Sequence, residues 1–149
     1  MDDRSFGFAT RAIHAGTPPD PVTGSRATPI YQSSAFVFAS TEAAAELFAL
    51  RGYGHIYSRI SNPTVASFEE RMASLEGGLG GVAFSSGLAA QLAIVLALAR
   101  NGDHLLCSQN VYGGTLTQFT VTIERMGIAA SFAPVDDLDA LRAAIRPET

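Results

Sequence analysis

The sequence contains no lysine. Its ten positively charged side chains are all arginines, and against 14 acidic residues they leave a formal net charge of −4. A reaction that needs a lysine amine, such as Schiff-base formation with a carbonyl compound, is therefore excluded for this polypeptide alone. Clustered basic side chains, which grip the phosphates of nucleic acids, are also missing, so we expect no nucleic-acid surface.

Cysteine and long apolar runs are scarce too. The single cysteine, Cys107, excludes an internal disulfide framework and indicates a reducing compartment, for which we expect the cytoplasm. Cys107 lies in an apolar run and is interpreted as a small buried side chain, not a nucleophile. The longest apolar run, Leu88 to Ala99, is shorter than the ~20 residues that a membrane helix requires. The start, MDDRSFGF, is no signal peptide, and the three histidines show no metal-ligand spacing.

The residues that are present can build a core, since 47% of them are hydrophobic and 16% charged. Residues 1–61 include the turn-rich stretch TPPDPVTG and are predicted to form an N-terminal arm. Residues 62–149 are predicted to form an α/β domain. It opens with a helix that Asn62 caps, that begins at Pro63 and that ends at Gly77.

From Gly81 onward, short apolar runs alternate with helical patterns. The runs GVAF, HLLCS and IAASFA are predicted to be strands, and the segments LAAQLAIVLALA, TLTQFTVTIERMG and DDLDALRAAIR are predicted to be helices. Strands without polar alternation that are joined by helices indicate a parallel sheet covered on both faces. Ligands bind at the carboxyl ends of such strands, so the turns that follow the strands are candidate sites.

Two turns carry candidate binding groups. In Ser85-Ser86-Gly87-Leu88, the glycine lets the backbone approach a ligand at a helix N-terminus, which is a ready anion site. An ordinary turn with serines capping the helix fits the same residues. In NVYGGT, the ring of Tyr112 is placed to lie over a planar ligand, or else it plugs the sheet edge.

The stretch HIYSRISNPT offers a third candidate. If it is extended, Tyr57 and Arg59 point the same way and present a phenol and a guanidinium, a pair that suits a phosphate. The alternative is that Tyr57 packs against a neighbouring isoleucine and Arg59 makes a surface ion pair. A phosphate group and a planar ring together describe pyridoxal 5'-phosphate well.

Several motifs together resemble the pyridoxal-phosphate enzymes of cysteine and methionine metabolism. They are YSRISNPT, SSGLAA, VYGGT, AIHAG and PIYQSSAF, and the resemblance runs from about Ala9 to the end. It implies the first half of the mostly parallel large domain of a fold type I transferase, truncated. The stretches ELFALRGYGHIYSRISNPT and YGGTLTQF are most similar to the O-acetylhomoserine sulfhydrylase branch, because methionine γ-lyases usually have cysteine where Gly114 stands.

The resemblance also implies roles for individual residues. The backbone amides of Gly87 and Leu88 would bind the cofactor phosphate, and Tyr112 would stack on the pyridine ring and assist proton movement as a catalytic residue. Tyr57 and Arg59 would reach the phosphate from a neighbouring subunit of a homo-oligomer, expected to be a homotetramer. The implied reaction, in methionine biosynthesis, replaces the acetate of an O-acylhomoserine by sulfide and gives homocysteine. A cystathionine γ-synthase or methionine γ-lyase relative is the alternative.

The sequence departs from that family in one large respect. The Schiff-base lysine and the motifs for the aspartate on the pyridine nitrogen, the Ser/Thr phosphate donors and the substrate-binding arginine do not occur. We therefore expect a truncated piece, about the first third of such an enzyme, that is inactive alone. A noncatalytic binding or assembly module is the alternative outside the enzyme class.

Overall fold

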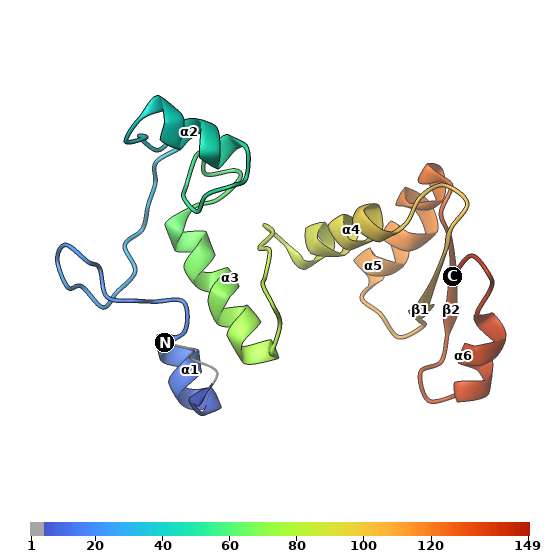
Figure 1. Ribbon diagram of the computed structural model, residues 1–149. Coiled ribbons are helices and arrows are strands. Elements are labelled where there is room, and N and C mark those ends of the chain that lie inside the picture. The colour runs from blue at the N-terminus through green and yellow to red at the C-terminus, as the bar shows by residue number, and fades with distance from the viewer. Residues whose placement is uncertain (1–4) are drawn as a thin grey trace. The chain divides into compact units, whose positions relative to one another are not determined.

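The computed structural model describes residues 5–149 (Figure 1). Residues 1–4 lie outside the described residues. They begin the predicted arm, and they belong to the stretch MDDRSFGF, for which the sequence predicted no signal peptide. The chain divides into two compact units, Met1–Ala83 and Phe84–Thr149, which are considered one at a time below. The predicted division at residue 61 concerns contacts with a neighbouring subunit, and it stays a prediction.

Within its described residues, 5–83, the first unit contains three helices, α1 (Phe8–His14), α2 (Thr41–Phe48) and α3 (Pro63–Glu76). The prediction for α3 is confirmed at both ends. The side chain of Asn62 accepts a hydrogen bond of 2.9 Å from the N–H of Thr64, and Gly77 ends the helix in the left-handed conformation with φ 71°. Helices α1 and α2 lie inside the predicted arm, where sequence reasoning identified no helix.

The loop after α1 lies directly against α3. Arg71 of α3 donates a hydrogen bond of 3.0 Å from Nε to the carbonyl oxygen of Ala15. Gly16 follows with φ +69°, and a Cβ at this position would stand 2.5 Å from the carbonyl oxygen of Ser67. Only glycine fits both the left-handed backbone and this close approach, which explains the glycine of the AIHAG motif.

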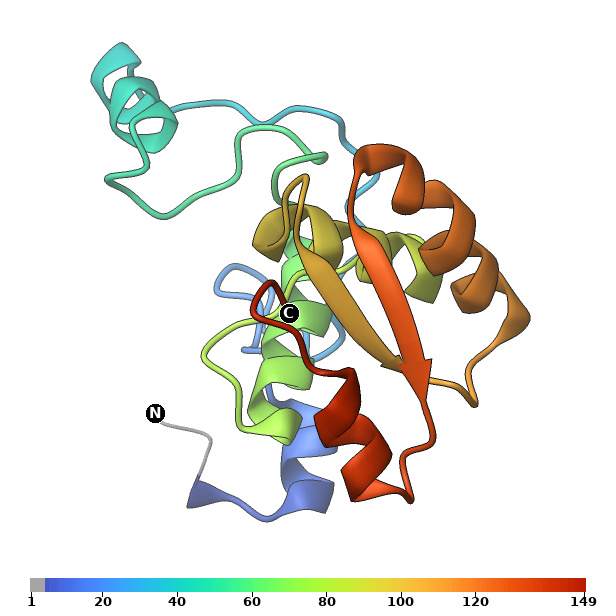
Figure 2. The ribbon, with the colours of Figure 1, turned by 90° about the vertical axis from the view of Figure 1, so that its right-hand side faces the viewer.

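The second unit is built around two strands, β1 (His104–Ser108) and β2 (Ala129–Ala133). They pair in parallel, with Leu105 opposite Ala130 and Cys107 opposite Phe132, and Figure 2 shows them side by side. The helices are α4 (Gly87–Leu98), α5 (Gly113–Thr117) and α6 (Leu138–Ala144). A parallel pair joined by a helical crossover confirms the α/β class.

Two predictions about elements are wrong. The run GVAF (81–84) is not a strand, because it pairs with no other strand within residues 5–149 and the N–H of Ala83 instead donates to Oε1 of Glu69 at 2.7 Å. The helix expected across TLTQFTVTIERMG is not continuous. After α5 it becomes a π-helix, η2 (Gln118–Thr122), and a 3-10 helix, η3 (Glu124–Met126). Four consecutive β-branched residues, Thr120 to Ile123, crowd the backbone of this segment, which weakens its preference for a regular α-helix.

The core of the second unit lies between the strands and the helices that precede and follow β1. Its most buried side chains come from α4, the π-helix and the segment before β2, and they are Val95, Phe119, Ile123 and Ile128. Partly buried side chains of both strands pack against them, Cys107 among them. Burial raises the pKa of the Cys107 thiol, which favours the inert role predicted for it. Across residues 5–149, no helix is long and apolar enough to cross a membrane.

Candidate cofactor site

The turn before α4 presents free backbone donors. Ser86 caps the helix, since its Oγ accepts a hydrogen bond of 3.1 Å from the N–H of Ala89 and its carbonyl oxygen accepts one of 3.0 Å from Ala90. The N–H groups of Gly87 and Leu88 meet no acceptor in the described chain. The cap formed by Ser86 is therefore compatible with the predicted anion site, because it leaves two donors at the positive end of a 12-residue helix.

The position of Gly87 is open. A Cβ added there would meet no atom within 4 Å, so packing within the chain does not require glycine. The free space lies beside the two unpaired N–H groups, where a phosphate would need close access to the backbone.

Tyr112 lies next to this turn. Its side chain is 74% exposed, so it does not plug the sheet edge, which was the alternative interpretation. A Cβ built on Gly114 would stand 2.5 Å from Cε1 of Tyr112 and 3.1 Å from Cδ1 of Leu88. The tyrosine ring and the Leu88 side chain thus approach the same bare stretch of backbone, and the structure brings two of the predicted cofactor residues together.

Two hydrogen bonds fix α5 and the π-helix to α4. Nε2 of Gln118 donates to the carbonyl oxygen of Leu88 at 3.0 Å. Oγ1 of Thr115, a residue only 4% exposed, donates to Oε1 of Gln91 at 3.0 Å. Sequence reasoning missed these positioning contacts. The one available signal was Gln91 itself, the polar residue that interrupts the apolar helix.

Tyr57 and Arg59 lie in the first unit, and they also lie together. Cζ of Arg59 is 5.5 Å from the centroid of the Tyr57 ring, a cation–π contact. The extended backbone expected through Arg59 is wrong: Tyr57 forms a bridge with Ala35, and the extended conformation goes no further. Residues 58–60 form a turn, because the N–H groups of Ile60 and Ser61 both donate to the carbonyl oxygen of Tyr57.

Arg59 is also free of acidic partners. The ion pairs found in residues 5–149 join Arg51 to Glu46 and Arg142 to Asp139. The surface ion pair considered as an alternative for Arg59 is therefore not formed, and its guanidinium stays available to an anion.

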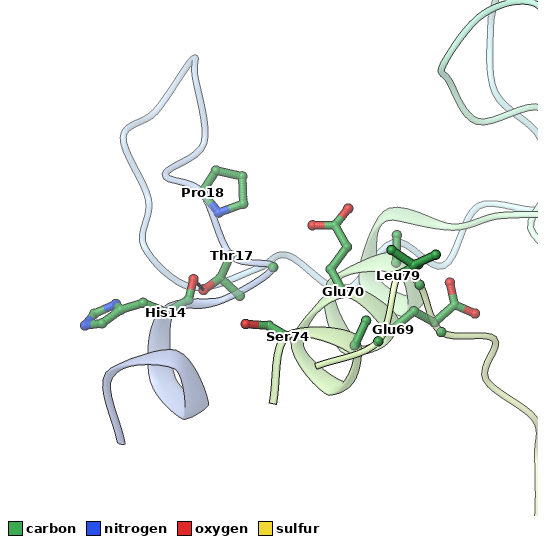
Figure 3. A pocket seen from close by; sticks show the side chains of 13 residues that line it. His14, Thr17, Pro18, Glu69, Glu70, Ser74 and Leu79 are labelled. Carbon is green, nitrogen blue, oxygen red and sulfur yellow. Dashed lines mark hydrogen bonds between the residues drawn. The ribbon is translucent and has the colours of Figure 1, made fainter. Parts of the chain in front are cut away.

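A hollow of about 760 Å³ lies elsewhere in the first unit (Figure 3). His14, Thr17, Glu70 and Ser74 are among the residues of α1, α3 and the loops after them that line it. It contains none of the five predicted cofactor residues. No group of three or more His, Cys, Asp or Glu side chains suited to a metal ion is found in the described part of the chain.

These features define a class of protein: an α/β fold in which a helix N-terminus that can bind an anion lies beside an exposed aromatic ring. Comparison with known sequences then identifies the family. The chain belongs to the Cys/Met metabolism PLP-dependent enzymes, whose pattern it matches over residues 9–149.

Individual relatives agree with this assignment. An O-acetyl-L-homoserine sulfhydrylase of Corynebacterium glutamicum is 52% identical over 145 residues, which are 97% of this chain and 33% of the relative. An L-methionine gamma-lyase of Pseudomonas putida is 43% identical over 143 residues, which are 96% of this chain and 36% of the relative. The chain thus spans about a third of the length of the curated relatives it matches.

A solved structure shows the same fold. A Campylobacter jejuni O-acetylhomoserine (thiol)-lyase, which carries N'-pyridoxyl-lysine-5'-monophosphate, superposes with a TM-score of 0.91 at 39% identity. The superposition covers 97% of this chain and 35% of that one. It confirms that the chain has the fold of part of a pyridoxal-phosphate enzyme, as the resemblance implied.

Proposed function

We propose that this chain is the N-terminal part of a pyridoxal-phosphate-dependent O-acetylhomoserine sulfhydrylase, which replaces acetate by sulfide at the γ-carbon and forms homocysteine. The observation that carries the proposal is the meeting of the Leu88 side chain and the Tyr112 ring at Gly114, next to two unpaired backbone N–H groups. The 52% identity to the Corynebacterium sulfhydrylase supports this branch over the lyase branch, where the identity is 43%.

The residues present fit the cofactor. The N–H groups of Gly87 and Leu88 would hold its phosphate, and the exposed face of Tyr112 would cover its ring. Tyr57 and Arg59 of a partner copy would complete the phosphate site with a phenol and a guanidinium. When bound, pyridoxal phosphate supplies the electron sink for γ-replacement. The Tyr112 hydroxyl would exchange a proton with the substrate amine, which the exposure of this side chain supports.

The amine that binds the cofactor covalently cannot come from these 149 residues, because they include no lysine. We therefore propose that the chain by itself is inactive and that the rest of the enzyme supplies this group. A noncatalytic assembly module is the second candidate, and the same absence of lysine favours it. Adding pyridoxal phosphate to the chain and recording the cofactor absorbance tests the point, since a covalent adduct with a side chain would contradict the proposal.

The substrate assignment is tested with the natural gene product that contains this chain. It is assayed with O-acetylhomoserine and either sulfide or cysteine as the sulfur donor, and separately with methionine. We expect homocysteine from sulfide. Turnover with cysteine alone would point to a cystathionine γ-synthase, and elimination from methionine without a sulfur donor would point to a γ-lyase.

The shared site is tested by mixing two defective variants of that gene product. Arg59→Met removes the charge offered to a partner's phosphate, and Gly87→Asp places a carboxylate at the phosphate turn itself. Each should lower cofactor affinity at least about tenfold, because hydrogen bonds to charged groups are lost or opposed. Arg51→Met is the matched control, since Arg51 is exposed but paired with Glu46.

Unfolding and reassociating the two variants together should restore some activity. In random mixing half of the dimers are mixed, and each mixed dimer has one native site of two, so about a quarter of native activity should return. Recovery no greater than the sum of the separate variants would contradict a site shared between subunits.

A further inference from the structure

Asn62 does more than cap a helix. Its side chain is buried, with 6% exposure, and the amide uses both of its N–H groups as well as its oxygen. Nδ2 donates to the carbonyl oxygen of Tyr31 and to Oγ of Ser58, each at 2.9 Å, while Oδ1 accepts from the N–H of Thr64. Capping requires only the oxygen, so the two donated bonds need another explanation.

One of the donated bonds holds Ser58, the residue between Tyr57 and Arg59. Oγ of Ser58 accepts a hydrogen bond from Nδ2 of Asn62, and the same hydroxyl donates one to the carbonyl oxygen of Ser33. The N–H of Ser58 donates to the carbonyl oxygen of Ser34 at 2.9 Å. Ser58 is thus fixed through its side chain and its backbone, and the chain cannot rotate there without breaking these bonds.

The other donated bond fixes the segment that supports this turn. Tyr31 is held through both of its backbone groups: its carbonyl oxygen accepts from Asn62, and its N–H donates to Oγ1 of Thr64 at 2.9 Å. Oγ1 of Thr64 in turn donates to the carbonyl oxygen of Pro29 at 2.8 Å. The start of α3 therefore holds residues 29–31, and the residues that follow them, 33–35, contact Tyr57 and Ser58.

We infer that Asn62 is a positioning residue, which orders the Tyr57–Arg59 turn before the cofactor phosphate arrives. The inference rests on the proposed function, in which Tyr57 and Arg59 bind that phosphate. A turn that is already ordered binds more tightly, because association does not have to restrict its backbone and side chains. Asn62 itself need not contact the ligand.

The test separates positioning from capping in the full gene product. Asn62→Ser keeps an oxygen that caps α3 well but lacks the amide donors, whereas Asn62→Ala lacks both. We expect both variants to raise the dissociation constant of pyridoxal phosphate about tenfold, measured by titrating the apoprotein. Asn62→Ser should melt below the native temperature because the two donated hydrogen bonds are lost, and Asn62→Ala should melt lower still because the cap is lost as well. At saturating cofactor, kcat of Asn62→Ser should approach the native value.

Two further variants act as controls. Ser40→Ala removes the cap of α2, where Oγ of Ser40 accepts from Ala43 at 3.1 Å, and it should lower the melting temperature without changing cofactor affinity. Ser58→Ala removes one partner of Asn62 and should weaken affinity in the same direction. The double variant Asn62→Ser/Ser58→Ala should be weaker than Asn62→Ser by less than Ser58→Ala is weaker than the native protein, because the contact between the two side chains is lost only once, while the bond from Ser58 to Ser33 is lost in either background.

The outcomes distinguish the inference from the function on which it rests. Native cofactor affinity in Asn62→Ser, together with weakened affinity in Arg59→Met, would overturn the positioning role and leave the phosphate site standing. Native affinity in Arg59→Met as well would contradict the proposed role of the turn.

Discussion

Gly114 lies so close to the ring of Tyr112 that a Cβ on the glycine would stand 2.5 Å from Cε1 of the tyrosine. A methyl group at this position must displace the ring or the backbone. Because the ring is the proposed cover of the cofactor, a side chain at position 114 of this chain would shift that cover.

Gly114→Ala should therefore weaken the site. We expect cofactor affinity and kcat/KM in the full gene product to fall about tenfold, since misplacing a group that orients the reactants is costly. The neighbouring Gly113→Ala is the matched control, because a Cβ at Gly113 would meet nothing within 4 Å. Equal effects of the two substitutions would show that the Tyr112 contact is not responsible.

Gly87→Asp should change stability and cofactor binding in opposite directions. A carboxylate in the first turn of α4 interacts favourably with the helix dipole, by about 0.3–1 kcal/mol, while it repels a phosphate at the same turn. Urea unfolding and cofactor titration of one sample measure both effects. Gly80→Asp is a control for added charge, since a Cβ there also meets nothing within 4 Å. Unchanged cofactor affinity in Gly87→Asp would contradict the proposal that this turn binds the cofactor phosphate.

Thr115→Val should destabilise the second unit. The substitution keeps the shape of the side chain but leaves Oε1 of Gln91 without the hydrogen bond that Thr115 donates at 3.0 Å. The expected loss in the free energy of unfolding is about 1–3 kcal/mol. Thr117→Val, on the exposed side of the same helix, should cost little. A loss no larger than that of Thr117→Val would mean that the buried bond contributes nothing.

Stability should fall as the pH drops below about 6.5, in part because of His104. Burial lowers the pKa of His104, and Arg146 lowers it further while Glu148 opposes the shift. At pH values between the lowered pKa of folded His104 and the ordinary pKa of about 6.5, the imidazole binds a proton in the unfolded protein but not in the folded protein. Lowering the pH through this range therefore favours unfolding. Above pH 6.5, His104 is neutral in both the folded and the unfolded protein, and its contribution to the free energy of unfolding is fully present.

Urea unfolding at several pH values, compared between the native protein and His104→Asn, measures this contribution. The native protein should lose stability more steeply than the variant as the pH falls through this range. Parallel curves for the two proteins would show that His104 does not titrate with unfolding. The side chain makes hydrogen bonds of 2.8 Å with Ser131 and 2.7 Å with Thr149, so the variant is also expected to be less stable at neutral pH.

Features that depend on neighbouring residues could be predicted from the sequence. The limits of α3 follow from Asn62, Pro63 and Gly77, whose conformational preferences are local. The apolar runs that became β1 and β2 were likewise readable. The run GVAF was not, because a strand exists only when another strand pairs with it, and within residues 5–149 it has no such partner.

The sequence by itself determined the family and the absence of lysine, since motifs and composition do not depend on packing. Only the tertiary structure decided which groups meet: Thr115 bonds to Gln91 across 24 residues, and Asn62 bonds to Tyr31 across 31. Such contacts depend on how helices and turns pack in three dimensions, and the local preferences of the residues do not predict them. For that reason the candidate ligand groups could be named from the sequence, while the residues that hold them in place could not.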